Sequence, residues 1–302
     1  MKDLLNYYYF LLPDKIHMIN NNYYFNYKNH FFGFYLYNGN LEDINSIYNL
    51  NNYMIFNNYK INRIIINKES SIITKKDNKN YILIELIEYN KNKINLKNIL
   101  EFNKKQVFIN VLNRTNWYFL WSNKIDNIEY TLNHIKYKYR QLYNSSSYYI
   151  GLAENAISYL KYLNLNNNNI SVCHKRINVN NDLKEFYNPI NLIIDYKVRD
   201  LAEYYKSIFF NRNIDIKSII NSIKTIKMSN IDYVYFYIRL LYPSYYFDIF
   251  DNILNNKNKE DDIMKITKLQ DDYEYFLYEV YKVIREYVNV VGIDWINKKF
   301  AN

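Results

Sequence analysis

Short apolar runs separated by turn residues dominate the first third of the chain. Asn38-Gly39-Asn40 forms a turn before an expected helix over about Leu41–Tyr48, and Asp77–Asn80 forms a second turn. Runs of this length, rich in aromatic and β-branched residues, predict strands. The expected strands are 23–25, 31–37, 63–67, 70–75 and 81–87. The pattern therefore predicts an antiparallel sheet accompanied by a helix.

From about Asn95 the apolar positions recur at helical spacing. A long helix is predicted after Asn116, and we interpret Trp117 and Trp121, one turn apart, as core residues rather than as a ligand platform. Asp200 and Glu203 have the spacing of a capping box at the start of a later helix. Further helices are expected to begin at Pro243 and to span Asp271–Val288. The remainder of the chain is thus predicted to be mainly helical.

Two apolar runs with polar ends carry the residues with candidate chemistry. The first is Ile170–Arg176, which contains His174, and the second is Asn191–Asp195. Each has the length of a buried strand that delivers a polar side chain to a site. The segment 199–203, Arg-Asp-Leu-Ala-Glu, follows them and opens a helix. We expect the two strands to lie side by side.

The order of these motifs resembles the aminoglycoside-phosphotransferase and choline-kinase-like superfamily, and within it the spore-coat branch of the CotS type. The stretches 117–126, 151–157 and 239–247 also suit that branch, so the resemblance covers roughly residues 115–250. It implies an α+β, protein-kinase-like two-lobed fold. A small antiparallel-sheet lobe would span 1–110, and a larger helical lobe with the catalytic-loop region would span 111–302.

The resemblance also assigns residues to the degenerate site. His174 falls at the loop histidine, Arg176 at the catalytic aspartate, and Asn181 and Asp195 at the two magnesium-binding positions. A guanidinium cannot lose its proton at physiological pH, so Arg176 cannot act as the general base. We expect Arg176 to pair with Asp195 instead, and we expect any magnesium site at Asn181 and Asp195 to be vestigial.

The first hundred residues lack parts that hold ATP in such enzymes. Gly33 and Gly39 are the only two closely spaced glycines, their spacing is wrong for a phosphate-binding loop, and Asn40 stands where a lysine is needed. In the strand 81–87, where we expect the phosphate-pairing lysine, the polar candidate is Glu85. An acid there would repel phosphate.

Charge and composition give little support to a nucleic-acid-binding role. The 302 residues carry a formal net charge of +9 with a sequence pI of about 9.1. The composition favours Asn, Lys, Ile and Tyr together, all of which have A/T-rich codons, so genome composition explains the lysines. Lys136, Lys138 and Arg140 alternate with tyrosines that could stack on bases, but we interpret this stretch as a solvated helix face.

The compartment is predicted from what the sequence lacks. Cys173 is the only cysteine, which excludes an intramolecular disulfide and suits a reducing interior. No apolar run reaches the ~18 residues that a membrane-spanning helix requires. The histidines show no spacing typical of a metal site. We expect a cytoplasmic protein that can be deposited on the forming spore.

The function we predict is that of a catalytically impaired, pseudokinase-like scaffold or interaction protein with protein partners of the spore coat and no cofactor. The alternative is a small-molecule phosphotransferase that uses ATP and Mg²⁺, holds the metal with Asn181 and Asp195, and takes its base from Asp182. A basic nucleic-acid-binding protein is the third hypothesis.

Overall fold

The computed structural model describes residues 1–88, 92–105, 107, 109–163, 169–211 and 214–301. The chain forms two compact units. The first, here called the sheet unit, comprises Met1–Asn113 and Ser171–Ile194, and the second, the helical unit, comprises Arg114–Ile170 and Asp195–Asn302. The predicted division of the chain at residue 110 stays a prediction.

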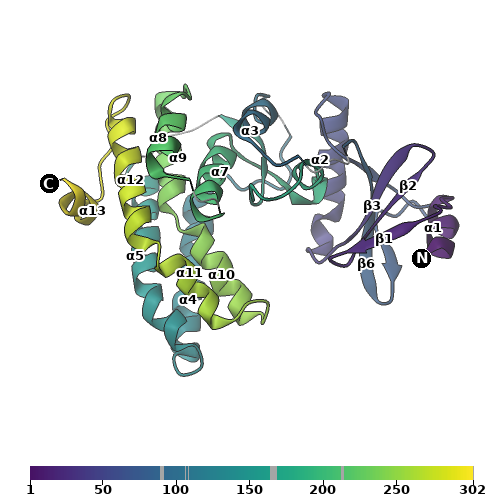
Figure 1. The fold of residues 1–302 in the computed structure, drawn as a ribbon, viewed down its shortest axis with the longest axis horizontal. Helices are drawn as coiled ribbons and strands as arrows, with labels where there is room; N and C mark the ends of the chain where they lie inside the picture. Colours follow the sequence, from purple (N-terminus) through teal and green to yellow (C-terminus); the bar gives the residue numbers. More distant parts are fainter. Residues whose placement is uncertain (89–91, 106, 108, 164–168, 212–213, 302) are drawn as a thin grey trace. The chain divides into compact units, whose positions relative to one another are not determined.

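The sheet unit is built on a six-stranded antiparallel sheet (Figure 1). Along the sheet the order is β1-β2-β3-β6-β4, and β5 also pairs with β6. The strands are β1 (Ile16–Ile19), β2 (Asn22–Tyr27), β3 (His30–Leu36), β4 (Arg63–Ile65), β5 (Thr74–Lys76) and β6 (Lys79–Leu86). Each of the five predicted strands overlaps an observed one, although β4 is shorter than predicted and β5 shares only Thr74 and Lys75 with the predicted strand 70–75. Strand β1 was not predicted.

Two-residue turns join the three hairpins of this sheet. The turns are Asn20-Asn21, Lys28-Asn29 and Asp77-Asn78, and all six residues have positive φ. Asparagine and aspartate tolerate this left-handed conformation better than other non-glycine residues, and paired left-handed residues match the twist of the flanking strands. The predicted turn at Asp77 is confirmed.

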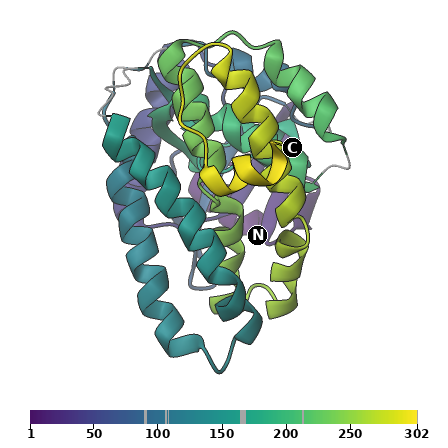
Figure 2. The same ribbon diagram turned by 90° about the vertical axis from the view of Figure 1, so that its left-hand side faces the viewer.

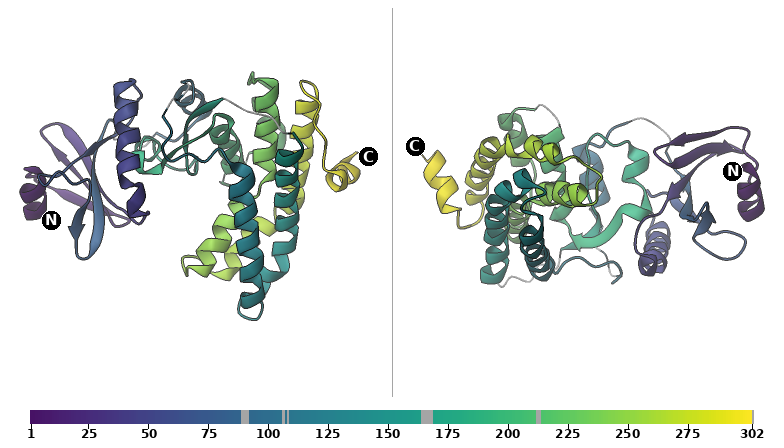
Figure 3. Two further views of the ribbon diagram at one scale, coloured as in Figure 1. Left: turned by 180° about the vertical axis from the view of Figure 1, so that it is seen from behind. Right: turned by 90° about the horizontal axis from the view of Figure 1, so that it is seen from below.

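Each face of the sheet is covered by a helix. One face packs Tyr35 and Ile84 against Ile47 of α2 (Ile44–Phe56), which follows a single 3₁₀ turn, η1 (Leu41–Asp43). The opposite face packs Phe34 around Leu5 of α1 (Lys2–Tyr9). Because side chains alternate along a strand, both faces of these strands are apolar and need cover. Figure 3 shows α2 lying along the sheet.

The remaining elements of the sheet unit surround the catalytic-loop region. Strands β7 (Ile170–His174) and β8 (Leu192–Tyr196) pair with each other, which confirms that the two polar-tipped runs lie side by side. Their terminal residues 170, 195 and 196 fall in the helical unit. The other elements are α3 (Leu96–Phe102), α6 (Leu183–Phe186) and η2 (Pro189–Asn191).

The helical unit opens with two long helices that lie side by side (Figure 2). Asn116 caps the first of them by accepting a hydrogen bond from the Phe119 amide, as the sequence predicts for a helix starting here. The helices are α4 (Trp117–Ile135), α5 (Arg140–Leu163), α7 (Val198–Asn211), α8 (Ile216–Lys224), α9 (Asn230–Leu241), α10 (Ser244–Leu254), η3 (Glu260–Ile263), α11 (Met264–Thr267), α12 (Gln270–Arg285) and α13 (Asp294–Phe300).

The predicted capping box at Asp200 is wrong. Helix α7 begins at Val198, so Asp200 is its third residue and lies fully buried in the first turn. Pro243 does stand at the N-cap of α10, and α12 corresponds to the helix predicted over Asp271–Val288, but it ends at Arg285 and is followed by α13, so it is not the final helix. Within the described residues, no helix is long and apolar enough to cross a membrane.

Candidate functional site

His174 is held as a packing residue at the end of β7. Its side chain is 1% exposed, and its ring stacks on Phe186 with 4.3 Å between ring centroids. Its Nε2 donates to the carbonyl oxygen of Phe186 at 2.8 Å. With one face stacked and one nitrogen bonded to the backbone, this histidine orders the loop rather than reaching a substrate.

Arg176 and Asn181 are exposed on the loop that follows β7. The Arg176 guanidinium donates from Nη1 to the carbonyl oxygen of Lys175 at 2.8 Å, and the Asn181 amide closes a turn onto the carbonyl oxygen of Asn178 at 2.9 Å. Asp182, the alternative base, forms an ion pair with Lys93 at 2.7 Å.

Asp195 lies fully buried at the end of β8, and donors of the helical unit engage both of its oxygens. Trp117 Nε1 donates to Oδ1 at 2.8 Å, and the Tyr196 amide donates to the same oxygen at 2.7 Å. Arg199, four residues further on, donates to Oδ2 at 2.5 Å. Burial raises the pKa of Asp195, and the positive charge of Arg199 opposes that rise. The pairing expected with Arg176 stays a prediction, because Arg176 belongs to the sheet unit.

A second buried ionic cluster lies beside this carboxylate in the helical unit. Glu203 accepts hydrogen bonds from Arg239 at 2.9 Å, from Ser244 at 3.2 Å and from Lys206 at 3.4 Å. The Arg239 guanidinium also lies 5.3 Å from the ring centre of Trp117. Trp117 therefore contacts both clusters and links them. Trp117 and Trp121 are buried in the core as predicted, but the sequence did not indicate that one of them binds Asp195.

The sheet unit contributes two buried tyrosines to the catalytic-loop region. Tyr24 of β2 and Tyr35 of β3 donate from their hydroxyls to Glu185 Oε1, at 3.2 and 3.3 Å. Burial, followed by the charge of Glu185, raises the pKa of Tyr24 to about 12. The buried Asn62 contributes a third hydrogen bond, because its Nδ2 donates to the carbonyl oxygen of Lys184 at 2.9 Å. The sheet and the loop are thus joined by side chains whose partners lie more than a hundred residues away.

The order of elements identifies the strand on which protein kinases carry their phosphate-pairing lysine. That lysine lies on the third strand and pairs with a glutamate on the helix that follows. Here the corresponding strand is β3 and the helix is α2, which moves the expected position from Glu85 on β6 to β3. β3 contains no lysine, and α2 contains no charged residue. Tyr35 lies on the face of β3 that packs toward α2.

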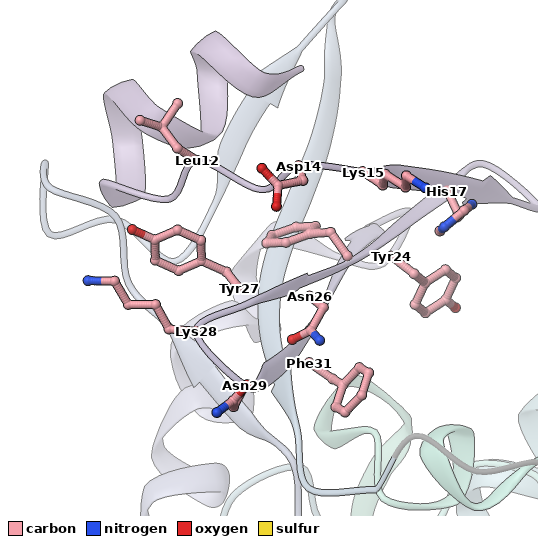
Figure 4. Close-up of a pocket in the computed structure, with 11 residues that line it drawn as sticks. Leu12, Asp14, Lys15, His17, Tyr24, Asn26, Tyr27, Lys28, Asn29 and Phe31 are labelled. Atoms are coloured by element: carbon pink, nitrogen blue, oxygen red, sulfur yellow. The ribbon is translucent and has the colours of Figure 1, made fainter.

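The hairpin β1–β2 also lacks the features of a phosphate-binding loop. Its turn is only the two residues Asn20-Asn21, with no glycine. A cavity of about 730 Å³ opens beside this hairpin, but Figure 4 shows that its cationic side chains do not converge. Lys28 extends away from the other labelled residues, while Lys15 and His17 lie toward the opposite end. A phosphate needs several donors aimed at one point.

Among the described residues, no group of three or more His, Cys, Asp or Glu side chains could hold a metal ion. Asp195 is engaged by Trp117 and Arg199 as described, and a magnesium ion would have to compete with these donors. The vestigial site expected at Asn181 and Asp195 stays a prediction.

Comparisons with known proteins support the fold and the family. Residues 2–280 match the model of the family described as "Spore coat putative kinase YutH". The chain is 27% identical over 163 residues to the endospore coat-associated protein YutH of Bacillus subtilis strain 168. That alignment spans 48% of the chain and 48% of the relative, so the match covers about half the length of that curated protein.

Solved structures with a similar fold are small-molecule phosphotransferases. Spectinomycin phosphotransferase, solved with ADP and spectinomycin, matches with a TM-score of 0.55 and 13% identity, covering 93% of this chain and 97% of that one. An aminoglycoside phosphotransferase from Alicyclobacillus acidocaldarius matches with a TM-score of 0.57 and 9% identity, covering 91% and 93%. A microcompartment-associated aminopropanol kinase matches with a TM-score of 0.53 and 8% identity, covering 94% of each chain. The fold is therefore kinase-like, as predicted.

Proposed function

Because the chain belongs to the YutH family of spore-coat kinase-like proteins, we propose that it is a non-catalytic kinase-fold protein that acts as a scaffold or interaction protein of the spore coat. The kinase-like fold supplies the architecture, and the residues at the candidate site argue against phosphoryl transfer. The proposal carries no requirement for ATP or magnesium.

The observation that carries the proposal is the hydrogen bond from Tyr35 to Glu185. On this face of the third strand, protein kinases place a lysine that pairs the nucleotide phosphates. Here Tyr35 is 3% exposed and bonds, together with Tyr24, to the loop segment that contains Glu185. The Lys184 ammonium lies beside them, 4.5 Å from the centre of the Tyr24 ring. A nucleoside triphosphate would therefore meet the hydrogen-bonded pair of Tyr35 and Glu185 on this face, in place of the lysine that those kinases supply.

Two further observations support the absence of turnover. The first is that Arg176, by the resemblance of the sequence, falls at the position of the catalytic base, and a guanidinium holds its proton at any physiological pH. The second is that the Asp195 carboxylate already accepts hydrogen bonds from Trp117, Tyr196 and Arg199. A phosphotransferase would need this carboxylate for its metal ions, which neutralise the charge that develops during transfer.

Nucleotide binding and phosphoryl transfer can be tested on the full chain. We expect no rise in melting temperature with ATP and Mg²⁺, because a ligand that binds the folded state would raise it by mass action. Spectinomycin phosphotransferase with its own substrates serves as the positive control. We also expect no release of ADP above background with amine or hydroxyl substrates.

A nucleotide-dependent thermal shift together with ADP release that disappears in Asp182→Asn would overturn the proposal. That outcome would favour the alternative phosphotransferase with Asp182 as its base. A thermal shift without turnover would leave the scaffold role standing but would show that the site keeps a nucleotide.

The proposed role as a scaffold of the spore coat requires a separate measurement, in sporulating cells that make this protein. A fluorescent fusion should localise to the spore periphery, and the Asp182→Asn variant should localise equally well, since the scaffold role does not use that carboxylate. Localisation that depends on Asp182 at unchanged protein level would contradict a non-catalytic role.

A further inference from the structure

A cavity of about 500 Å³ lies within the helical unit, away from the residues that hold Asp195. The C-terminal half of α5, the middle of α9 and the segment 289–295 form its walls. Its volume falls within the range of small-molecule sites, ~300–1,000 Å³. All of its lining residues belong to one unit and to the described part of the chain.

Packing fixes the C-terminal wall of this cavity. The Tyr159 hydroxyl on α5 donates to the carbonyl oxygen of Val291 at 2.5 Å. Trp295 packs edge-on against Tyr148, with 5.7 Å between ring centroids, and the side chain of Ile293 is buried. Gly292 lets the backbone approach Tyr281, because a Cβ there would lie 2.7 Å from the Tyr281 ring. The wall therefore has a defined position without a ligand.

The chemistry of the lining is aromatic and carries at most one negative charge. Four rings contribute, those of Tyr159, Tyr162, Tyr237 and Trp295. Asp294 is the one acidic residue among the lining residues, and none of them is a lysine, arginine or histidine. That lack of cations is notable in a chain with 39 lysines and arginines and a net charge of +9. The lining therefore offers an anionic ligand no positively charged side chain.

Two tyrosines of the cavity, Tyr159 and Tyr237, have raised pKa values and so act as neutral rings and hydroxyls. Burial raises the pKa of Tyr159 to about 12, and the nearby Asp294 carboxylate acts in the same direction. Burial likewise raises the pKa of Tyr237 well above its usual value. Aromatic rings together with one carboxylate are a combination by which proteins bind organic ammonium ions, since ring faces attract a weakly hydrated cation.

We propose that this cavity binds an organic ammonium group, with the aromatic rings contacting its alkyl substituents and Asp294 balancing its charge. The group can belong to a free small amine or to a lysine side chain of a partner protein. Tyr162 is 83% exposed and Trp295 is 39% exposed, so the mouth is open to a ligand of either size. This binding does not depend on whether the chain transfers phosphate.

The test uses the full chain and tetramethylammonium chloride as the probe, with sodium chloride at equal ionic strength as the blank. Binding is followed by tryptophan fluorescence, and the Trp295→Phe variant removes the reporting indole. Calorimetry on the same samples gives an independent readout. Tert-butanol, a neutral compound of similar shape, is the comparison ligand. We expect saturable binding of the cation and at least about fivefold weaker binding of the alcohol.

Two variants and two matched controls locate the site. Asp294→Asn and Tyr162→Leu should each weaken tetramethylammonium binding at least about fivefold, since each removes charge or ring contact from an exposed position. Glu154→Gln on α5 and Tyr137→Leu, which is 96% exposed outside the cavity, should leave binding unchanged. Circular dichroism confirms that each variant is folded.

A lysine-containing hexapeptide in a second titration distinguishes the two sources of the ammonium group. Tighter binding of the peptide than of tetramethylammonium assigns the site to a partner's lysine, and the reverse order assigns it to a free amine. The proposal is overturned if neither cation saturates, if tert-butanol binds as well as the cation, or if Asp294→Asn and Glu154→Gln bind equally.

Discussion

The indole N–H of Trp117 donates to Asp195 across 2.8 Å, although 78 residues separate them in the sequence. The same carboxylate pairs with Arg199 at 2.5 Å. Asp195 is thus embedded in the helical unit as a structural anion whose two oxygens have protein donors. This arrangement explains how a carboxylate with no exposed surface is tolerated, because a buried charge is costly unless it is paired and hydrogen-bonded.

Removing the Arg199 guanidinium while Asp195 remains should destabilise the protein strongly. Arg199→Ala would leave the Asp195 carboxylate buried without its ion-pair partner, which costs about 3–5 kcal/mol in comparable cases. The double variant Asp195→Asn with Arg199→Met should recover most of that loss, because an amide keeps the hydrogen bond from Trp117 and no charge is left buried. Urea denaturation of the three proteins measures both effects. A loss below 1 kcal/mol in Arg199→Ala would show that another group pairs with Asp195.

Whether the sequence could predict a contact of this site depends on how far apart the two residues lie along the chain. The strand that contains Asp195 was predicted from its local apolar run, and the pairing of β7 with β8 was expected from the resemblance to kinase-like enzymes. The ion pair with Arg199 joins residues only four positions apart, but Asp195 lies on β8 and Arg199 on α7, so the helical i,i+4 rule does not predict it. The bonds from Tyr24 and Tyr35 to Glu185 could not be predicted either, since they join residues 161 and 150 positions apart. Contacts of that range come from the fold as a whole.

Neutralising Glu185 should lower the pKa of Tyr24. In the native protein burial and the negative charge of Glu185 raise that pKa to about 12. Glu185→Gln removes the charge but leaves the ring buried, so the pKa should fall while remaining above its ordinary value near ~10. A pH titration of ¹³C-labelled tyrosine by nuclear magnetic resonance, with Tyr24→Phe to assign the signal, gives the value. An unchanged pKa would contradict the hydrogen bond between Tyr24 and Glu185.

Buried tyrosines should make the protein sensitive to alkali. Burial raises the pKa values of Tyr9, Tyr59 and Tyr159 to about 12, against ~10 in an unfolded chain. Between these two values the unfolded chain loses protons that the folded chain retains. The contribution of these tyrosines to the free energy of unfolding should therefore be constant below pH ~10 and should fall as the pH rises toward 12.

Urea denaturation at several pH values between 8 and 11.5 measures this loss. Tyr9→Phe should show a shallower decline than the wild-type protein, because a phenylalanine at that position cannot ionise. Tyr9 also bonds Thr74 at 2.7 Å, so the comparison concerns the slope with pH and not the stability at neutral pH. Equal slopes for the two proteins would mean that Tyr9 ionises alike in the folded and unfolded chains.

The ion pair between Lys93 and Asp182 should contribute little to stability. The lysine side chain is 53% exposed and that of Asp182 is 22% exposed, and pairs open to solvent contribute about 0–1 kcal/mol. Asp182→Asn should therefore lower the free energy of unfolding by less than about 1 kcal/mol. If the loss in free energy of unfolding is this small, Asp182→Asn stays folded in the activity assays. A change in turnover in this variant could then not be attributed to unfolding. A loss of several kcal/mol would show that Asp182 has a larger structural role.

The glycine that shapes the C-terminal segment offers a test with an internal control. A Cβ at Gly292 would lie 2.0 Å from Asn297 Nδ2 and 2.7 Å from Cζ of Tyr281. The asparagine side chain can rotate away, but the Tyr281 ring is only 8% exposed and is held by its neighbours. Gly292→Ala should therefore cost about 1–3 kcal/mol, the usual result of overpacking.

Gly151 lies inside α5 with open space around its Cβ position, and alanine there should stabilise the protein by roughly 0.5–1 kcal/mol. Urea denaturation of the two variants should give changes of opposite sign. Equal stabilities would mean that the segment around Gly292 relaxes freely and does not form a fixed wall.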